Sequence, residues 1–276
     1  MKYIFVLKHL AFSGILLIIL LVYIRLIERR TIFYPMKKIE FTPSDSGMKY
    51  EDIFFWTADG KKLNGWFVPS PLSDAVKPRA TLLYCHGNGG NISHRIEIIK
   101  MFNQLNMNVF IFDYRGYGKS EGSPSEKGIY LDVLAAYDYL LKRGDTEKNK
   151  IVVYGESLGS AVAIELASRV NIAGIICFGG FTSAVAVANE IFPFLGVLIT
   201  QKFISIPKIK KVSVPKLIIH SRQDEIVPFR HGEELFASAN APKEFLAIRG
   251  GHNDAVFVSY NEFKTGIESF IKKYLR

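Results

Sequence analysis

The chain has 276 residues, of which 49% are hydrophobic and 22% charged, a balance that fits a globular protein and excludes a disordered one. Its net charge of +9 is uneven, because residues 1–40 hold seven Lys or Arg against two Glu and the other 236 residues carry only +4. This distribution is unlike the broad basic surface of a nucleic-acid-binding protein, so we expect no nucleic-acid partner. The length allows one large domain with a substantial core.

An apolar segment fills residues 3–24, where Lys8 is the only fully charged side chain. Its length matches the roughly 20 apolar residues that cross a bilayer, and basic residues flank both ends. We therefore expect an uncleaved, single-pass membrane anchor over residues 1–30. A cleaved signal peptide and a buried core helix are the alternatives. The first lacks a small-residue cleavage site, and the flanking charge argues against the second. The slightly heavier positive charge after the segment favours a cytoplasmic location for the rest of the chain.

Strands and helices alternate through the rest of the chain, after a polar linker. Apolar or alternating runs predict strands at 51–57, 62–68, 80–86, 107–113, 150–155, 173–178, 215–220 and 244–248, the first two as a hairpin. Helical patterns lie near 92–105, 127–143, 158–170 and 231–239, and from residue 261 onward. This alternation predicts an α/β fold with a mostly parallel sheet covered by helices on both faces.

The two cysteines, Cys85 and Cys177, each lie inside an apolar strand-like run. Buried free thiols are the simplest interpretation of this placement. The cysteines suggest neither a disulfide framework nor a metal site, and we expect the protein to need no cofactor.

The sequence "GESLG", residues 155–159, places Ser157 between a predicted strand and a predicted helix. The pattern G-x-S-x-G is typical of a sharp turn that exposes a serine Oγ at the edge of a sheet. Gly155 and Gly159 would allow the close packing that such a turn needs. The alternative is that Ser157 only caps the following helix.

A nucleophilic serine needs a base, and the base needs a carboxylate to orient it. Asp224 lies in "SRQDE" just after one predicted strand, and His252 lies in "GGHND" just after the last. The chain order Ser157, Asp224, His252 is the order of the α/β-hydrolase architecture. Other residues near the same sheet edge stay open as substitutes for the acid or the base, namely Glu225, Asp254 and His86.

Two backbone N–H groups are candidates for an oxyanion hole. One belongs to Leu158, which follows the serine, and the other to Asn88 in the turn "HGNGGN" after a predicted strand. The glycines of this turn would let the backbone approach a substrate carbonyl. A phosphate cradle is the alternative for a glycine-rich turn, but the sequence lacks G-x-x-x-x-G-K-[ST].

Five segments together resemble the Bem46-like branch of the α/β-hydrolases: "HGNGGNISHR", "DYRGYGKSEGSPSE", "GESLGSAVA", "SRQDEIVPF" and "GGHND". The "FYP" after the apolar segment adds to this resemblance, which covers about residues 31–275. The resemblance implies an α/β-hydrolase domain over residues 31–276 and a membrane-anchored serine hydrolase of the esterase or thioesterase type. It also implies Ser157 as nucleophile, Asp224 as acid, His252 as base and the turn at Asn88 as oxyanion donor.

An apolar insertion at about residues 184–211 is expected to form a small cap over the serine. Within residues 185–200 the only charged side chain is Glu190. Such a cap favours an acyl chain or another apolar ester as substrate, with Phe192, Phe194 and Leu195 as expected contacts. The alternative is a helix that simply packs on the core.

Two other functions remain open at this point. A serine peptidase of the same fold would need carboxylates near the serine to bind a free N-terminus, and only Glu156 and Glu190 are obvious candidates. A non-catalytic membrane scaffold would be indicated by loss of the serine, the histidine or the acid, and all three are present.

Overall fold

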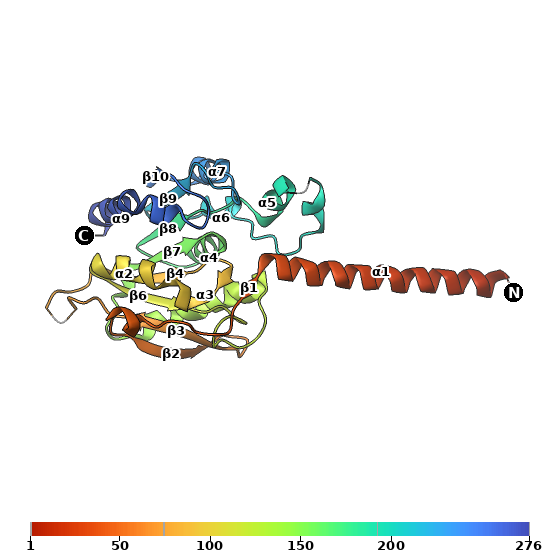
Figure 1. Cartoon of the computed structure of the whole chain (residues 1–276), viewed down its shortest axis with the longest axis horizontal. Coiled ribbons are helices and arrows are strands. Elements are labelled where there is room, and N and C mark those ends of the chain that lie inside the picture. The colour runs from red at the N-terminus through yellow and green to blue at the C-terminus, as the bar shows by residue number, and fades with distance from the viewer. Residues whose placement is uncertain (1, 74, 192, 276) are drawn as a thin grey trace.

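The computed structural model describes residues 2–73, 75–191 and 193–275, which contain an eight-stranded, mostly parallel sheet (Figure 1). The strand order across the sheet is β10-β9-β8-β7-β4-β6-β3-β2. Strands β2 and β3 form the predicted hairpin, β3 pairs antiparallel with β6, and the other neighbours are parallel. The α/β fold predicted from the sequence is confirmed. The strands are β2 Glu51–Trp56, β3 Lys62–Val68, β4 Ala80–Cys85, β6 Met107–Phe112, β7 Ile151–Glu156, β8 Gly174–Phe178, β9 Lys216–Ser221 and β10 Lys243–Ile248.

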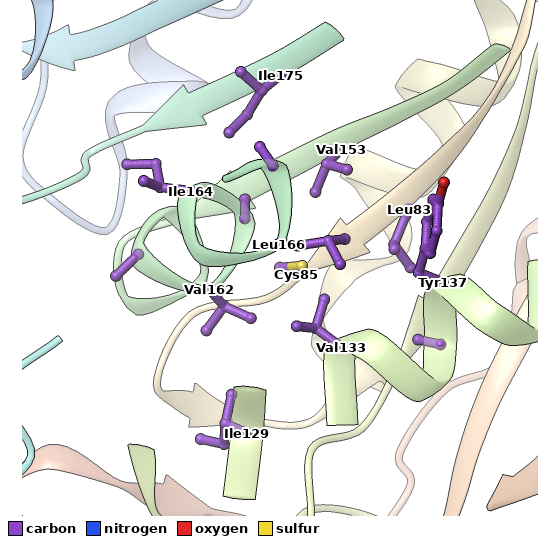
Figure 2. Packing of buried hydrophobic residues seen from close by; sticks show 14 of the residues in the cluster. Leu83, Cys85, Ile129, Val133, Tyr137, Val153, Val162, Ile164, Leu166 and Ile175 are labelled. Carbon is purple, nitrogen blue, oxygen red and sulfur yellow. The ribbon is translucent and has the colours of Figure 1, made fainter. Parts of the chain in front are cut away.

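The central strands are apolar along their whole length because helices cover both faces of the sheet. Every residue of β4 is buried, and successive side chains point to opposite faces. Leu82 packs with α2 and α9, whereas Leu83 packs with α3 and α4 in the cluster drawn in Figure 2. The helices are α2 Ile96–Gln104, α3 Glu126–Lys142, α4 Leu158–Ala167, α7 Arg230–Ser238, α8 Ala255–Val258 and α9 Tyr260–Tyr274.

Cys85 and Cys177 are free and buried in the neighbourhood of β7, as the sequence predicts. Burial raises the pKa of the Cys177 thiol to about 12 and also raises the pKa of Cys85. Neither side chain therefore forms a reactive thiolate near neutral pH.

The N-terminal segment is one long helix, α1 (Lys2–Ile32), which extends away from the sheet domain in Figure 1. Within the part of the chain that the structure describes, we find no helix with the length and apolar character needed to cross a membrane. The predicted membrane span over residues 3–24 thus finds no support there.

The C-terminal end of α1 packs on the sheet domain. Glu28 is buried, and its carboxylate accepts hydrogen bonds from Thr200 and Gln201. The domain boundary predicted after residue 30 therefore cuts through the last turns of a helix that is packed on the domain, because the polar bonds of Glu28 cannot be read from an apolar run.

Between β8 and β9 the chain leaves the sheet and forms the region predicted as a cap. This region contains α5 (Ala184–Ile191), a 3₁₀ helix η4 (Leu195–Leu198) and α6 (Ile206–Ile209). In Figure 1 the segment after α5 runs toward the C-terminal end of α1, which the hydrogen bonds to Glu28 also show. Helix α6 instead packs against α4. The part of this region that extends away from the sheet therefore ends before α6.

Candidate active site

Ser157 lies on a sharp turn between the end of β7 and the start of α4. Its backbone has φ +51° and ψ −118°, in a region that residues other than glycine rarely adopt. The two glycines of G-x-S-x-G make the turn possible. A Cβ at Gly155 would lie 2.2 Å from the Gly159 oxygen, and a Cβ at Gly159 would lie 1.9 Å from the Cys85 oxygen. The strained turn holds the Ser157 side chain beyond the carboxyl end of the sheet.

Three side chains predicted from the sequence meet at this turn. His252 Nε2 lies 2.9 Å from Ser157 Oγ, and His252 Nδ1 lies 2.7 Å from Asp224 Oδ2. The other oxygen of Asp224 accepts the backbone N–H groups of Ile226 at 3.0 Å and Val227 at 2.7 Å. The carboxylate is therefore fixed on one side by backbone and orients the imidazole on the other. This arrangement can transfer the serine proton to the imidazole.

The two acidic residues considered as substitutes for Asp224 have different partners. Glu225 Oε2 accepts the backbone N–H of His252 at 3.0 Å, and Asp254 Oδ1 accepts the N–H of Gly251 at 2.5 Å. Both carboxylates thus shape the loop that carries His252, while Asp224 faces the imidazole.

His86, considered as a substitute base, is fully buried next to Asp113 beneath the turn after β4. Its Nδ1–H donates to the Gly87 oxygen at 2.7 Å, and burial lowers the pKa of His86 to about 3. Burial likewise raises the pKa of Asp113 to about 7, against the opposing effect of the Ile92 N–H that donates to Oδ1 at 3.0 Å. The partners of both groups lie in and beneath this turn, whereas the Ser157 hydroxyl is paired with His252.

Residues 87–90, which we call the glycine loop, contain the predicted oxyanion donor Asn88. The backbone carbonyl oxygen of Asn88 accepts hydrogen bonds from the N–H of Tyr34 at 3.1 Å and from the hydroxyl of Tyr117 at 2.8 Å. The "YP" of "FYP" is strand β1 (Tyr34–Pro35), which pairs in parallel with β5 (Gly89–Gly90). The chain that leaves α1 therefore holds the glycine loop in place. The sequence offered "FYP" as a signal, but its pairing partner is more than 50 residues away.

Glu156, the residue before the serine, connects the turn at Ser157 to the glycine loop. Its Oε1 accepts the Gly87 N–H at 3.1 Å and lies 2.5 Å from Arg95 Nε, and its Oε2 accepts the Tyr84 hydroxyl at 2.7 Å. Arg95 in turn donates to the Gly89 oxygen at 2.8 Å. From the sequence, Glu156 is a candidate to bind the free N-terminus of a peptide. In the structure its carboxylate is instead occupied by Tyr84, Gly87 and Arg95.

A cavity of about 430 Å³ opens at Ser157, with Asn88 and Leu158 also on its wall. Its volume falls in the range of small-molecule sites, roughly 300–1,000 Å³. Leu158 is the first residue of α4, and the N–H groups of a first helical turn have no partner inside the helix. Most of the remaining wall is apolar and comes from α1, from α5 and from residues 198–199, 226 and 227.

The chain is similar in sequence to known proteins over most of its length. A family model described as serine aminopeptidase, S33 matches residues 76–206. YfhR of Escherichia coli K12 is 35% identical over 228 residues, which cover 81% of this chain and 79% of YfhR. Bem46 of Schizosaccharomyces pombe is 40% identical over 223 residues, which cover 77% of this chain and 74% of Bem46. The chain belongs to the Bem46-like family of α/β-hydrolases.

A solved structure of the same fold is similar to this Bem46-like hydrolase over most of its length. The Pyrococcus furiosus esterase Pf2001 matches with a TM-score of 0.74 at 23% identity, covering 89% of this chain and 98% of the esterase. At that identity the likeness shows a shared fold alone.

The substrate contacts predicted for this Bem46-like hydrolase differ from the wall that the structure shows. The Phe194 side chain is 89% exposed and lies outside the cavity wall. Its backbone has a left-handed φ of +71° at the turn before η4. Phe192 and the side chain of Leu195 lie outside the described part of the chain. The region contributes to the wall through other apolar residues, namely Ala184, Val187, Ala188, Ile191, Leu198 and Ile199.

Proposed function

We propose that the protein is a serine hydrolase that cleaves carboxylic ester or thioester bonds of substrates with an apolar acyl group. The observation that carries this proposal is the position of Ser157 Oγ. The Ser157 hydroxyl is hydrogen-bonded to His252, and Ser157 lines a cavity whose wall is largely apolar. An apolar pocket with a few convergent polar groups favours an acyl substituent over a sugar or a phosphate.

The proposed reaction begins when His252 Nε2 accepts the Ser157 hydroxyl proton and Oγ attacks the substrate carbonyl carbon. The carbonyl oxygen becomes negatively charged and accepts the N–H groups of Leu158 and Asn88. Asp224 stabilises the charged imidazole at Nδ1–H. The imidazolium then gives its proton to the departing alcohol or thiol, which leaves an acyl-serine. A water molecule, deprotonated by the same imidazole, attacks the acyl-serine and releases the carboxylic acid and the free serine.

The name of the matched family model raises peptide hydrolysis as the competing activity. An enzyme that binds a free N-terminus needs an available carboxylate near the serine. Glu156 is engaged by Arg95, and Glu190 Oε1 accepts from Arg230 Nε at 3.0 Å and lies 2.9 Å from His231 Nε2. These pairings favour an ester or thioester substrate over an aminopeptide.

We also propose that α1 attaches the protein to a membrane. Most of the apolar side chains described along this helix are exposed, including Leu10, Phe12, Ile15 and Ile19. An exposed apolar surface of this kind favours contact with lipid. The single-pass topology and the cytoplasmic side of the domain stay predictions.

A labelling experiment with a substrate panel tests the proposed activity. Detergent-solubilised protein should react covalently with a fluorophosphonate probe and hydrolyse p-nitrophenyl and thioester substrates faster than aminoacyl amides. Preference for aminoacyl amides would replace the proposal with peptidase activity. Absence of both labelling and hydrolysis would favour the non-catalytic scaffold.

A further inference from the structure

The last two and a half turns of α1, residues 24–32, form part of the wall of the cavity at Ser157. Ile24, Ile27, Thr31 and Ile32 line the same cavity as the Ser157 side chain. They face the wall formed by α5 and by Leu198 and Ile199, which come from a part of the chain about 170 residues away. A segment expected to serve only as a tether thus contributes a side of the site.

A buried carboxylate fastens this part of α1 to the end of the cap region. The Glu28 side chain is 3% exposed. One of its oxygens accepts the Gln201 N–H at 2.8 Å and the N–H of Thr200, and the other accepts the Thr200 hydroxyl at 2.6 Å. Arg25 bonds to Glu28 at 3.1 Å and to the Leu198 oxygen at 2.7 Å. We call these contacts the Glu28 clasp.

The Glu28 clasp fixes one position of α1 on the domain. A buried carboxylate costs stability unless hydrogen bonds satisfy it, and these donors come from one short segment. Burial would raise the pKa of Glu28, but the bonds from Thr200, Gln201 and Arg25 outweigh burial and lower it. A flexible tether would need neither a buried carboxylate nor a matched set of donors.

We propose that the end of α1 is a specificity-determining wall of an acyl-chain site, with the substrate's acyl chain lying along Ile24 and Ile27 and the Glu28 clasp holding that wall in register. This inference rests on the proposed ester hydrolysis and adds the substrate class, an ester of a medium or long acyl chain. The exposed apolar surface of α1 continues toward its N-terminus at Leu20 and Tyr23. A chain longer than the cavity would therefore stay in contact with apolar side chains.

The test compares the full-length protein with two matched variants on a p-nitrophenyl ester series from acetate to dodecanoate. In the wild type, kcat/KM should rise roughly fourfold for each added CH₂ until the site is full. Ile27→Asp places a charge on the wall and should reduce kcat/KM more strongly the longer the chain. Leu26→Asp places the same charge on the neighbouring residue, which lies outside this cavity, and should keep the wild-type slope.

A third variant tests the Glu28 clasp. Glu28→Gln removes the negative charge that pairs with Arg25 and exchanges one acceptor oxygen for an NH₂ group, which the guanidinium cannot bond. The Glu28 clasp should weaken, so the slope with chain length should fall in this variant as well. An Ile27→Asp series parallel to that of the wild type, or an equal reduction at every chain length, would overturn the assignment of the wall. An unchanged slope in Glu28→Gln would overturn the role of the clasp. A wild-type protein that neither labels nor hydrolyses any ester would remove the proposed function itself, which separates the two failures.

Discussion

The Glu156 carboxylate lies 2.5 Å from the Arg95 guanidinium, and this pair joins the turn at Ser157 to the glycine loop. Glu156 also binds the Gly87 N–H, and Arg95 also binds the Gly89 oxygen, so the pair contacts both sides of Asn88. The distance between the proposed nucleophile and the proposed oxyanion donor thus depends on two side chains that lie outside the lining of the cavity at Ser157.

Arg95→Met should lower kcat about 10- to 100-fold with little change in KM, because a displaced oxyanion donor is felt in the transition state. Arg95→Lys should recover part of the loss by restoring the charge next to Glu156. Steady-state kinetics on a short-chain ester would measure both parameters. A rise in KM at constant kcat would show that Arg95 acts on substrate binding and does not position the glycine loop.

Ser157→Ala should abolish fluorophosphonate labelling and lower ester hydrolysis by about 10⁴- to 10⁶-fold, because the reaction loses its nucleophile. Ser168→Ala, at the other end of α4 and away from the cavity, is the matched control and should keep full activity. Gel fluorescence and an ester assay measure the two effects. Labelling that persists in Ser157→Ala would identify a different nucleophile.

Asp113 should make the free energy of unfolding depend on pH. Burial raises its pKa to about 7 in the folded protein, whereas an unfolded aspartate titrates at about 3.9. Between these values the folded state holds the proton more tightly. The contribution of Asp113 is therefore fully present below about pH 4 and is lost as the pH rises to about 7.

Asp113→Asn cannot ionise and should remove this decline. Between pH 5 and 7.5 the wild type should lose on the order of 2 kcal/mol more stability than the variant. Urea denaturation at several pH values measures the difference between the two proteins, in which the shared titrating groups cancel. Identical pH profiles would show that Asp113 does not gain its proton in the folded state.

Truncation of α1 should have effects that depend on where the cut falls. A chain that begins at residue 21 keeps Ile24, Ile27 and the Glu28 clasp, so its preference for long acyl chains should match that of the full-length protein. A chain that begins at residue 31 loses the clasp and part of the wall and should show a flatter chain-length series and a lower melting temperature. Equal behaviour of the two truncated chains, measured by ester kinetics and thermal denaturation, would contradict a structural role for residues 24–28.

The alternation of strands and helices could be predicted from the sequence because it is a local property. Burial on both faces makes central strands such as β4 apolar throughout, and this pattern is visible without knowing which strands are neighbours. The turn at Ser157 is also local, since its two glycines lie within two residues of the serine. Chain order then places Asp224 and His252 after the carboxyl ends of β9 and β10, at the same edge of the parallel sheet.

The walls and supports of the site depend on contacts between distant segments, which no local pattern reports. Glu28 meets Thr200 across 172 residues, and Tyr34 pairs with Gly89 across 55. The apolar run predicts that the side chains of α1 are buried in an apolar environment. The run does not show whether that environment is lipid or the wall of a cavity, because both bury the same side chains. Only the tertiary structure decided that the end of α1 lies beside the serine, since that position depends on one buried carboxylate finding its donors at Thr200 and Gln201.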